Sequence, residues 1–462
     1  MSPDDIQNDR RKEACKIARR TSDDFSESFG SSSLDEVTPF ECDEVIFGRR
    51  IGSGTFSDVY QVKTINLHPN KSSTILGVTI GGKYTGEQIK SREATAKHVL
   101  NGVQYVVKSL KSKLEEGGDD DELDTFHDAA HDVVQEAEML AAFNHPNIVK
   151  IHGIIASRHD SFIDGPTGWF IILEKLRGTL ADSIEEWKKQ NSFNPRMSLN
   201  TLRSSISGSM VSLDKGKAEK VPKSKGGEAG SLNKRLRVAT STAGALTYLH
   251  SKGVIFRDLK PDNIGIDTRG NVKLFDFGLA TFMPQNVDPY EQSYKMSGAG
   301  TPRYQAPEVF YGEHYNLKAD VYSFSVVLWE ILWLKKPFPK CKNKKEFEQA
   351  MSKPLDKVHV IDRTWPLPIR SVVKKGTSRV PSNRPTMQEI HKTLDEFINH
   401  QPEKFEVEDR KLGPRQRSQS YALSADTLSP NKGPGRLGSS LTAAVASILT
   451  EELLDESDRR EQ

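Results

Sequence analysis

The chain has 462 residues, which at about 150 residues per domain predicts roughly three domains or lobes. Its 65 lysines and arginines nearly balance its 63 aspartates and glutamates, which excludes a general attraction to nucleic acid or to anionic lipid. Three widely spaced cysteines, Cys15, Cys42 and Cys341, exclude a disulfide framework and a zinc cluster and indicate a reducing compartment.

Polar stretches lie at both ends of the chain and also interrupt its middle. Residues 1–44 have clustered serines and scattered acids without a sustained apolar period, so they predict disorder and no signal peptide. Flexible insertions are predicted at about 64–101 and at 191–234, the second rich in Ser, Lys and Gly. The tail, 401–462, predicts mostly disorder, with a helix at 441–454.

Two structured blocks lie between these stretches. Residues 45–176 are mainly strand-like, with a helix-like stretch near 133–143, and residues 177–400 are mainly helical. The apolar run from Val321 to Leu334 is too short to cross a bilayer and predicts a buried helix. Strands followed by helices predict an α+β chain of two lobes. We expect the protein to be located in the cytoplasm, and the nucleus is the alternative compartment.

A glycine-rich turn opens the first block. Ile51, Gly52 and Gly54 lie between two strand-like runs, and Val59 follows on the second of them. Glycine lets backbone N–H groups approach a polyphosphate closely, because no Cβ lies in the way. The alternative is an ordinary hairpin, which this pattern alone leaves open.

A lysine and two carboxylates follow in the same block. Lys108 ends a strand-like run, and the later helix-like stretch carries Glu136 and Glu138. An ion pair with one of these carboxylates would hold the lysine ammonium beside phosphate oxygens. Taken alone, Lys108 favours the alternative of an outward-facing strand residue.

The strongest pattern lies in the second block, where Asp258, Asn263 and Asp276 occupy adjoining turns. Two aspartates and an asparagine supply hard oxygen ligands for Mg²⁺ and a proton acceptor beside it, as phosphoryl transfer requires. Further motifs follow in a fixed order: Gly300-Thr301-Pro302-Arg303-Tyr304, Ala306-Pro307-Glu308, Asp320-Val321-Tyr322-Ser323 and Asn383-Arg384-Pro385.

Together these motifs resemble those of eukaryotic Ser/Thr protein kinases over about residues 45–400, nearest the tyrosine-kinase-like branch. The resemblance implies a two-lobed protein-kinase fold with a small β-rich lobe, 45–176, and a larger helical lobe, 177–400. It also implies ATP and Mg²⁺ as cofactors and protein hydroxyls as substrates. No nucleic acid and no membrane span are expected.

The resemblance assigns roles to individual residues. It implies that Asp258 accepts the proton of the substrate hydroxyl, that Lys260 neutralises the γ-phosphate, and that Lys108 holds the α- and β-phosphates while paired with Glu136. It implies Asn263 and Asp276 as the metal ligands. The residues implied to enclose ATP are Ile51, Gly52, Gly54, Val59, Val106, Lys108, Leu173, Glu174, Leu176 and Gly265. Glu308 is expected to pair with Arg384 as a buried strut of the larger lobe.

Two features bear on the acceptor and on regulation. Lys260 and Thr301 are typical of Ser/Thr kinases and favour serine and threonine as acceptors. Arg257, beside the catalytic aspartate, predicts that a phosphate added by an upstream kinase to the activation segment regulates activity. Ser297 is the best candidate acceptor, and the competing ones are Thr281, Ser293 and Tyr294.

Departures from the family pattern leave alternatives open. Ser57 stands where the third glycine would be, and Phe256 replaces a histidine that packs beneath the phenylalanine of Asp-Phe-Gly. Both departures favour the alternative of a pseudokinase scaffold. The retained site residues oppose that alternative. Val106 is larger than the residue usual above the adenine, and Gly265 is smaller than the residue usual below it. Either side-chain volume has moved from the position below the adenine to the position above it, or both positions have changed by neutral drift.

Overall fold

The computed structural model describes residues 3–400 apart from gaps at 31–32, 55, 69–72, 76–77, 81–82, 116–119, 166–167, 193–231, 285–287, 353–360 and 364. These residues belong to one unit, 1–402. The predicted tail helix at 441–454 and most of the predicted insertion at 191–234 lie outside the described residues.

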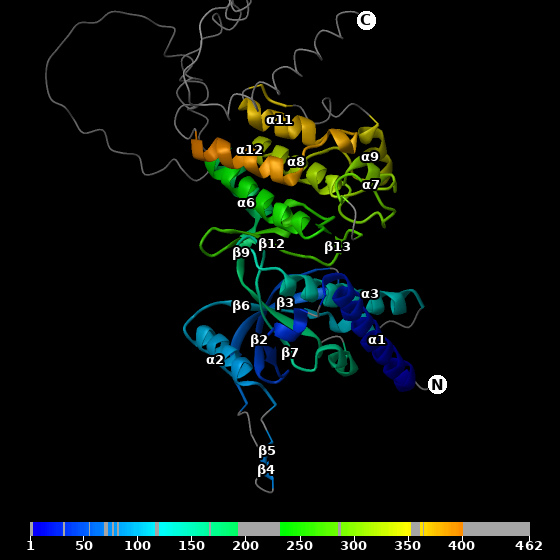
Figure 1. Ribbon diagram of the computed structural model, residues 1–462, viewed down its shortest axis with the longest axis vertical. Coiled ribbons are helices and arrows are strands. Elements are labelled where there is room, and N and C mark those ends of the chain that lie inside the picture. The colour runs from blue at the N-terminus through cyan, green and yellow to red at the C-terminus, as the bar shows by residue number, and fades with distance from the viewer. Residues whose placement is uncertain are drawn as a thin grey trace, which may run out of the picture. The chain divides into compact units, whose positions relative to one another are not determined.

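A mixed six-stranded sheet forms the core of the smaller lobe (Figure 1), in the order β1-β7-β8-β6-β3-β2. β1 and β7 are parallel and the other neighbours antiparallel. Its central strands β6 and β8 are almost wholly buried, which explains the apolar runs Val106-Val107 on β6 and residues 170–173 on β8. The strands are β1 (Pro39–Phe40), β2 (Val45–Ser53), β3 (Ser57–Ile65), β6 (Tyr105–Leu110), β7 (Ile151–Ile155) and β8 (Phe170–Glu174), and a separate hairpin joins β4 (Ser73–Ile75) to β5 (Val78–Ile80).

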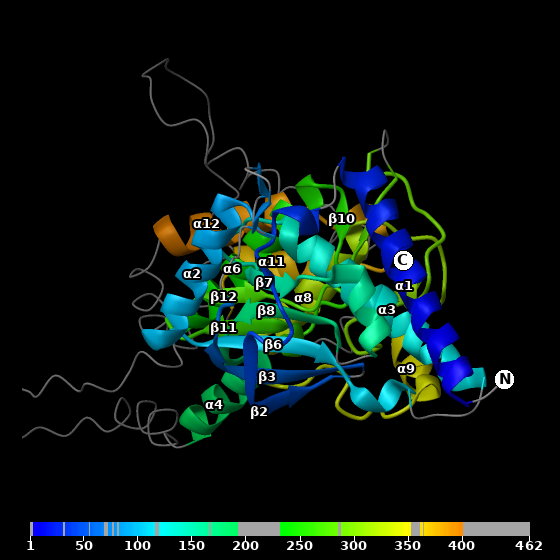
Figure 2. The same ribbon diagram turned by 90° about the horizontal axis from the view of Figure 1, so that it is seen from below.

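The prediction of disorder over residues 1–44 is wrong, because helix α1 (Pro3–Phe29) occupies most of this segment. α1 packs along helix α3 (Asp120–Ala142), the helix predicted near 133–143 (Figure 2). Its buried face is built mainly from small residues, which let the two helices approach closely: Ala14, Cys15, Ala18, Thr21, Ser22 and Phe25. The short 3₁₀ turns of this lobe are η1 (Ser33–Glu36), η2 (Ser112–Glu115) and η3 (Arg158–Asp164).

The prediction of a flexible insertion at 64–101 is also wrong, because helix α2 (Gly86–Leu100) lies within it. Thr85 and Gln88 form a reciprocal capping box at its start. Arg92 of α2 is buried and pairs with Glu44 at 2.5 Å, and it also donates to the carbonyl of Pro39 at 2.6 Å. The helix is therefore fastened to the edge of the sheet.

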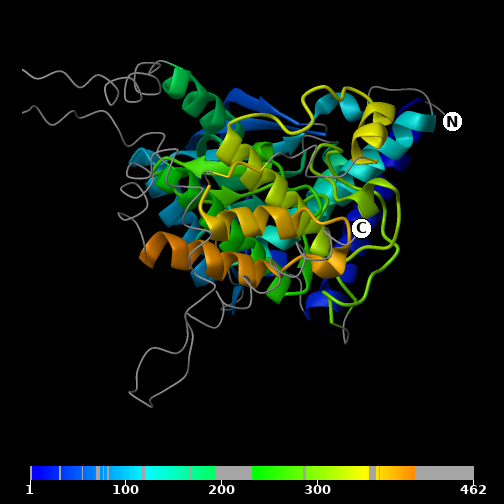
Figure 3. The same ribbon diagram turned by 90° about the horizontal axis from the view of Figure 1, so that it is seen from above.

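The larger lobe is mainly helical, which confirms the α+β two-lobed fold. Figures 1 and 3 show α6, α8, α11 and α12 lying side by side. Its helices are α4 (Leu180–Ser192), α6 (Leu232–Ser251), α7 (Pro307–Phe310), α8 (Lys318–Trp333), α9 (Lys344–Met351), α11 (Leu367–Gly376) and α12 (Met387–His400), with the 3₁₀ turns η5 (Pro261–Asn263) and η6 (Pro381–Asn383). α8 is buried from Lys318 to Leu332, as its apolar sequence predicted.

Short strands on the side of the larger lobe that faces the smaller lobe carry the turns of the candidate site (Figure 1). β9 (Leu176–Thr179), β11 (Ile264–Asp267) and β12 (Val272–Leu274) form one small sheet, and β10 (Val254–Ile255) pairs with β13 (Thr281–Phe282). The second pairing brings the segment before Asp258 next to the segment after Asp276. Residues far apart in the sequence thereby meet at the face that adjoins the smaller lobe.

Candidate active site

The glycine-rich turn joins β2 to β3 at the edge of the sheet. Gly52 lies opposite Val59, and the backbone N–H of Gly54 donates to the carbonyl oxygen of Ser57 at 2.7 Å. Ser57, which replaces the third glycine of the family pattern, is buried. Ile51 is 40 % exposed, so its side chain is accessible beside the turn.

Lys108 on β6 forms an ion pair with Glu136 on α3. Its Nζ also lies 3.7 Å from Oδ1 of Asp276, which belongs to the larger lobe. Burial by itself would lower the pKa of Lys108, but the charges of Glu136 and Asp276 outweigh it and raise that pKa, so the lysine remains a cation. The structure therefore brings three of the predicted site residues together from both lobes.

Asp258 is held by hydrogen-bond donors on both of its carboxylate oxygens. Oδ1 accepts from the backbone N–H of Thr301 at 2.9 Å and from its hydroxyl at 2.8 Å. Oδ2 accepts from Nζ of Lys260 at 2.6 Å and from Nδ2 of Asn263 at 3.1 Å. Lys260 also donates to the Thr301 hydroxyl at 3.1 Å. Asp258, Lys260 and Asn263 of this loop thus form one network with Thr301, in which the carboxylate of Asp258 is fixed in direction.

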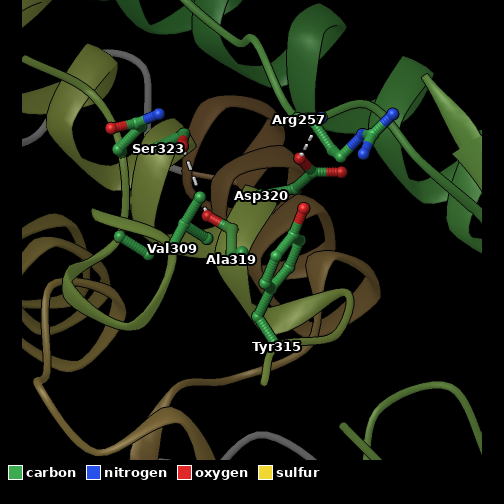
Figure 4. Close-up of a pocket in the computed structure, with 8 residues that line it drawn as sticks. Arg257, Val309, Tyr315, Ala319, Asp320 and Ser323 are labelled. Carbon is green, nitrogen blue, oxygen red and sulfur yellow. Dashed lines mark hydrogen bonds between the residues drawn. The ribbon is translucent and has the colours of Figure 1, made fainter. Parts of the chain in front are cut away.

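The backbone of this loop is anchored from below by Asp320 at the start of α8. Its carboxylate accepts from the N–H of Phe256 at 2.8 Å and of Arg257 at 2.9 Å, and it lies 2.9 Å from Nε2 of His250. These bonds hold Arg257 at a φ of 68°, in the left-handed region that non-glycine residues seldom adopt. Figure 4 shows the bond from Arg257 to Asp320 beside a small pocket. The sequence motif contained Asp320, but no role was predicted for it.

Phe256 packs against Phe277, the residue that follows Asp276. The two rings meet edge to face with centroids 5.2 Å apart, and both side chains are fully buried. The phenyl ring therefore fills the place that the family pattern gives to histidine.

The residues predicted to enclose the adenine lie on neighbouring strands. Val106 on β6 is opposite Leu173 on β8, and both are buried. Glu174 directs its carboxylate away along the lobe connection, where Oε1 lies 2.8 Å from Nζ of Lys273 and accepts from the N–H of Lys150 at 2.9 Å. The carboxylate of Glu174 thus bridges a residue of the smaller lobe, Lys150, and a residue of the larger lobe, Lys273.

Leu176 fills the space beside Gly265 on β11. A β-carbon at position 265 would lie 2.3 Å from Cδ1 of Leu176 and 3.2 Å from the carbonyl oxygen of Lys273. The sequence left two alternatives open, a transfer of side-chain volume from Gly265 to Val106 or neutral drift at both positions, whereas in the structure Leu176 takes the space beside Gly265. Spacing gave no indication of this, because the two residues meet only through the pairing of β9 with β11.

We expect Gly265→Leu to lower the free energy of unfolding by about 1–3 kcal/mol, the usual cost of overpacking. Adding Leu176→Ala to this variant should restore most of the lost stability, whereas adding Val106→Ala should not. Thermal unfolding of the single variant and of both combinations would measure this. Rescue by Val106→Ala and not by Leu176→Ala would show that the side chain of Val106 compensates for the missing side chain at Gly265.

Over residues 86–394 the sequence matches the family described as protein kinase domain. Dual specificity protein kinase shkC of Dictyostelium discoideum is 35 % identical over 36 % of this chain and 32 % of its own length. Serine/threonine-protein kinase 12 of Arabidopsis thaliana is 27 % identical over 65 % of this chain and 53 % of its own length. The match thus spans about half or less of these relatives.

None of the helices that the structure describes combines the length and the apolarity needed to span a bilayer. The family match extends from α2 to α12 and includes Lys108, Asp258 and Asp276. It covers more than half of the 462 residues, and so this chain belongs to the protein kinase family.

Proposed function

We propose that this chain is an ATP-dependent protein kinase that phosphorylates serine and threonine. The observation that carries the proposal is the contact of Lys108, already paired with Glu136, with Asp276 of the other lobe. A cation and a carboxylate facing each other there suit the phosphates of ATP and the metal that accompanies them. The relatives' names, which include serine/threonine and dual specificity kinases, support the same activity.

Asp258 and its neighbours would carry the chemical step. The substrate hydroxyl oxygen attacks the γ-phosphorus while the bond to the β–γ bridging oxygen breaks, and ADP leaves with that electron pair. The hydroxyl proton passes to the carboxylate of Asp258, which Thr301 and Asn263 hold in direction. Lys260 offsets the charge of the γ-phosphate, and Lys108 orients the α- and β-phosphates.

Asn263 and Asp276 fit a magnesium site by the chemistry of their donors. Asn263 uses its Nδ2 to donate to Asp258, which leaves its carbonyl oxygen as a ligand. Asp276 has a carboxylate that is 46 % exposed at the junction of the lobes. Mg²⁺ prefers such oxygen ligands and, when bound, would offset the negative charge of the phosphates.

A peptide-library assay with serine, threonine and tyrosine acceptors would test this proposal. We expect the wild-type chain to phosphorylate serine and threonine peptides with Mg²⁺ or Mn²⁺, and Asp276→Ala to transfer no phosphate. Absence of transfer by the wild type with both metals would favour a pseudokinase scaffold. Transfer to tyrosine alone would contradict the proposed acceptor class.

We further propose that phosphorylation of Ser297 by an upstream kinase activates the chain. Nη1 of Arg257 already donates to the hydroxyl of Ser297 at 3.3 Å, and the Tyr315 hydroxyl donates to its carbonyl oxygen at 2.6 Å. A phosphate on Ser297 would thus meet a guanidinium adjacent to Asp258. The new charge-assisted hydrogen bonds would order the segment that carries Thr301.

We expect phosphatase treatment to lower wild-type activity at least about tenfold, since a phosphate can form one to three strong hydrogen bonds with arginine. Ser297→Ala should already show the lower activity and should respond no further. Ser293→Ala is the matched control and should behave as wild type. Mass spectrometry would locate the phosphate; its placement on Thr281, Ser293 or Tyr294 would contradict the assignment.

The proposed partners are protein substrates and the upstream kinase, and the proposed compartment is the cytoplasm. In the part of the chain that the structure describes, Cys15, Cys42 and Cys341 form no disulfide, which suits a reducing environment.

A further inference from the structure

We propose that α1 is a positioning element that holds α3 in the orientation in which Glu136 meets Lys108. The effect of α1 on catalysis rests on the proposed kinase activity, whereas its effect on the position of α3 does not. The N-terminal helix lies beside α3 in Figures 1 and 2, on the side of the smaller lobe opposite α2.

The contact between the two helices is a buried face and not an incidental touch. Ala14, Ala18 and Phe25 are 5 % exposed or less and recur at helical spacing along α1. On α3, Phe126, Ala130 and other apolar residues are equally buried in the same cluster. Small side chains on α1 allow close packing, so displacement of α1 would uncover an apolar face of α3.

Glu138 ties α3 to the segment that follows α1. It is fully buried, and its Oε2 accepts from the backbone N–H groups of Ser33 at 2.9 Å and Leu34 at 3.3 Å. Residues two apart on a helix point about 200° apart, because each residue turns the chain by roughly 100°. Glu136 and Glu138 therefore face nearly opposite sides, and α3 is held between Lys108 on one side and the N-terminal segment on the other.

α1 also reaches the segment that follows Asp276. The ring of Phe25 meets that of Phe282 edge to face, with centroids 5.4 Å apart, and Phe29 lies 6.0 Å from the same ring. α3 contacts this segment as well, since Gln135 donates to the carbonyl oxygen of Ala280. α1 thus contacts both α3, which carries Glu136, and the segment that follows Asp276.

The anchor for this hold is the turn η3, which connects β7 to β8 of the sheet. Arg19 of α1 pairs with Asp160, and the hydroxyl of Ser22 lies 2.8 Å from Nε2 of His159. α1 therefore contacts the turn between two strands of the sheet on one side and packs against α3 on the other. This arrangement allows α1 to fix the position of α3 relative to β6, on which Lys108 lies.

Two variants of the full chain would test the inference, Phe25→Ala and Ala18→Asp. The control is Glu27→Ala, at an exposed position on the same helix. We expect both variants to raise amide hydrogen exchange across α3 at least about tenfold while exchange across the buried helix α8 stays at the wild-type rate. Their kcat/KM should fall by a similar factor, and Glu27→Ala should match wild type in every measurement.

Unchanged exchange across α3 in both variants would overturn the inference. An equal rise across α3 and α8 would do so too, because it would show a general loss of stability and no specific hold on α3. Failure of the proposed function is distinguishable from these outcomes. A wild-type chain that transfers no phosphate would remove the catalytic readout, while the ratio of α3 to α8 exchange would still decide whether α1 positions α3.

Discussion

Asp258→Asn is expected to lower the rate of phosphoryl transfer about 10²- to 10⁴-fold, the usual contribution of a positioned general base. All four neighbours of the carboxylate are donors: the N–H and hydroxyl of Thr301, Nζ of Lys260 and Nδ2 of Asn263. An asparagine must point its NH₂ group at one pair of these donors, so the loop would lose alignment as well as the base. Single-turnover transfer to a peptide from the library would measure the loss.

Asp262→Asn is the matched control, because Asp262 lies in the same loop and is exposed. It should leave the rate close to wild type. Thermal unfolding of both variants would show whether Asp258→Asn still folds. A folded Asp258→Asn chain that keeps more than about a tenth of the wild-type rate would remove Asp258 from the role of base.

The loops that carry the site could be predicted from the sequence because their chemistry restricts the residue types. Asp258, Asn263 and Asp276 are polar residues on short turns, and no apolar period competes with their interpretation. The preference for Glu136 over Glu138 followed from family spacing, and the structure pairs Glu136 with Lys108. The polar loop residues form local motifs, and the pairing of Lys108 with Glu136 follows from the order in which the motifs occur along the sequence.

Features that depend on packing between distant segments could not be predicted. The buried face of α1 consists of residues such as Ala14, Ala18 and Ser22, whose weak hydrophobicity gives no clear apolar period. Its burial depends on α3, more than ninety positions further along the chain. Likewise Leu176 meets Gly265 only when β9 pairs with β11. α2 is different, since the pattern from Thr85 to Gln88 is a capping box that the sequence already contained.

Glu308→Gln is expected to destabilise the larger lobe by about 3–5 kcal/mol, the usual effect of removing one partner from a buried ion pair. Arg384 is fully buried and grips both oxygens of Glu308, at 2.6 and 2.8 Å. Its remaining donors bind the carbonyl oxygens of Lys318 at 3.0 Å and Ser378 at 2.8 Å. The variant would leave this guanidinium buried without a counter-charge. The thermal midpoint should fall on the order of 10 °C.

Glu185→Gln provides the matched control, because the pair of Glu185 with Lys188 on α4 is exposed and such pairs contribute about 0–1 kcal/mol. A double variant, Glu308→Leu with Arg384→Leu, should be more stable than Glu308→Gln, since it removes the unpaired charge together with its partner. Calorimetry of the three variants would separate the two effects. If Glu308→Gln lowered the midpoint no more than Glu185→Gln, the pair would not be the strut that joins α7 to the turn at η6. If the double variant were the least stable, the hydrogen bonds from Arg384 to Lys318 and Ser378 would matter more than the charge pair itself.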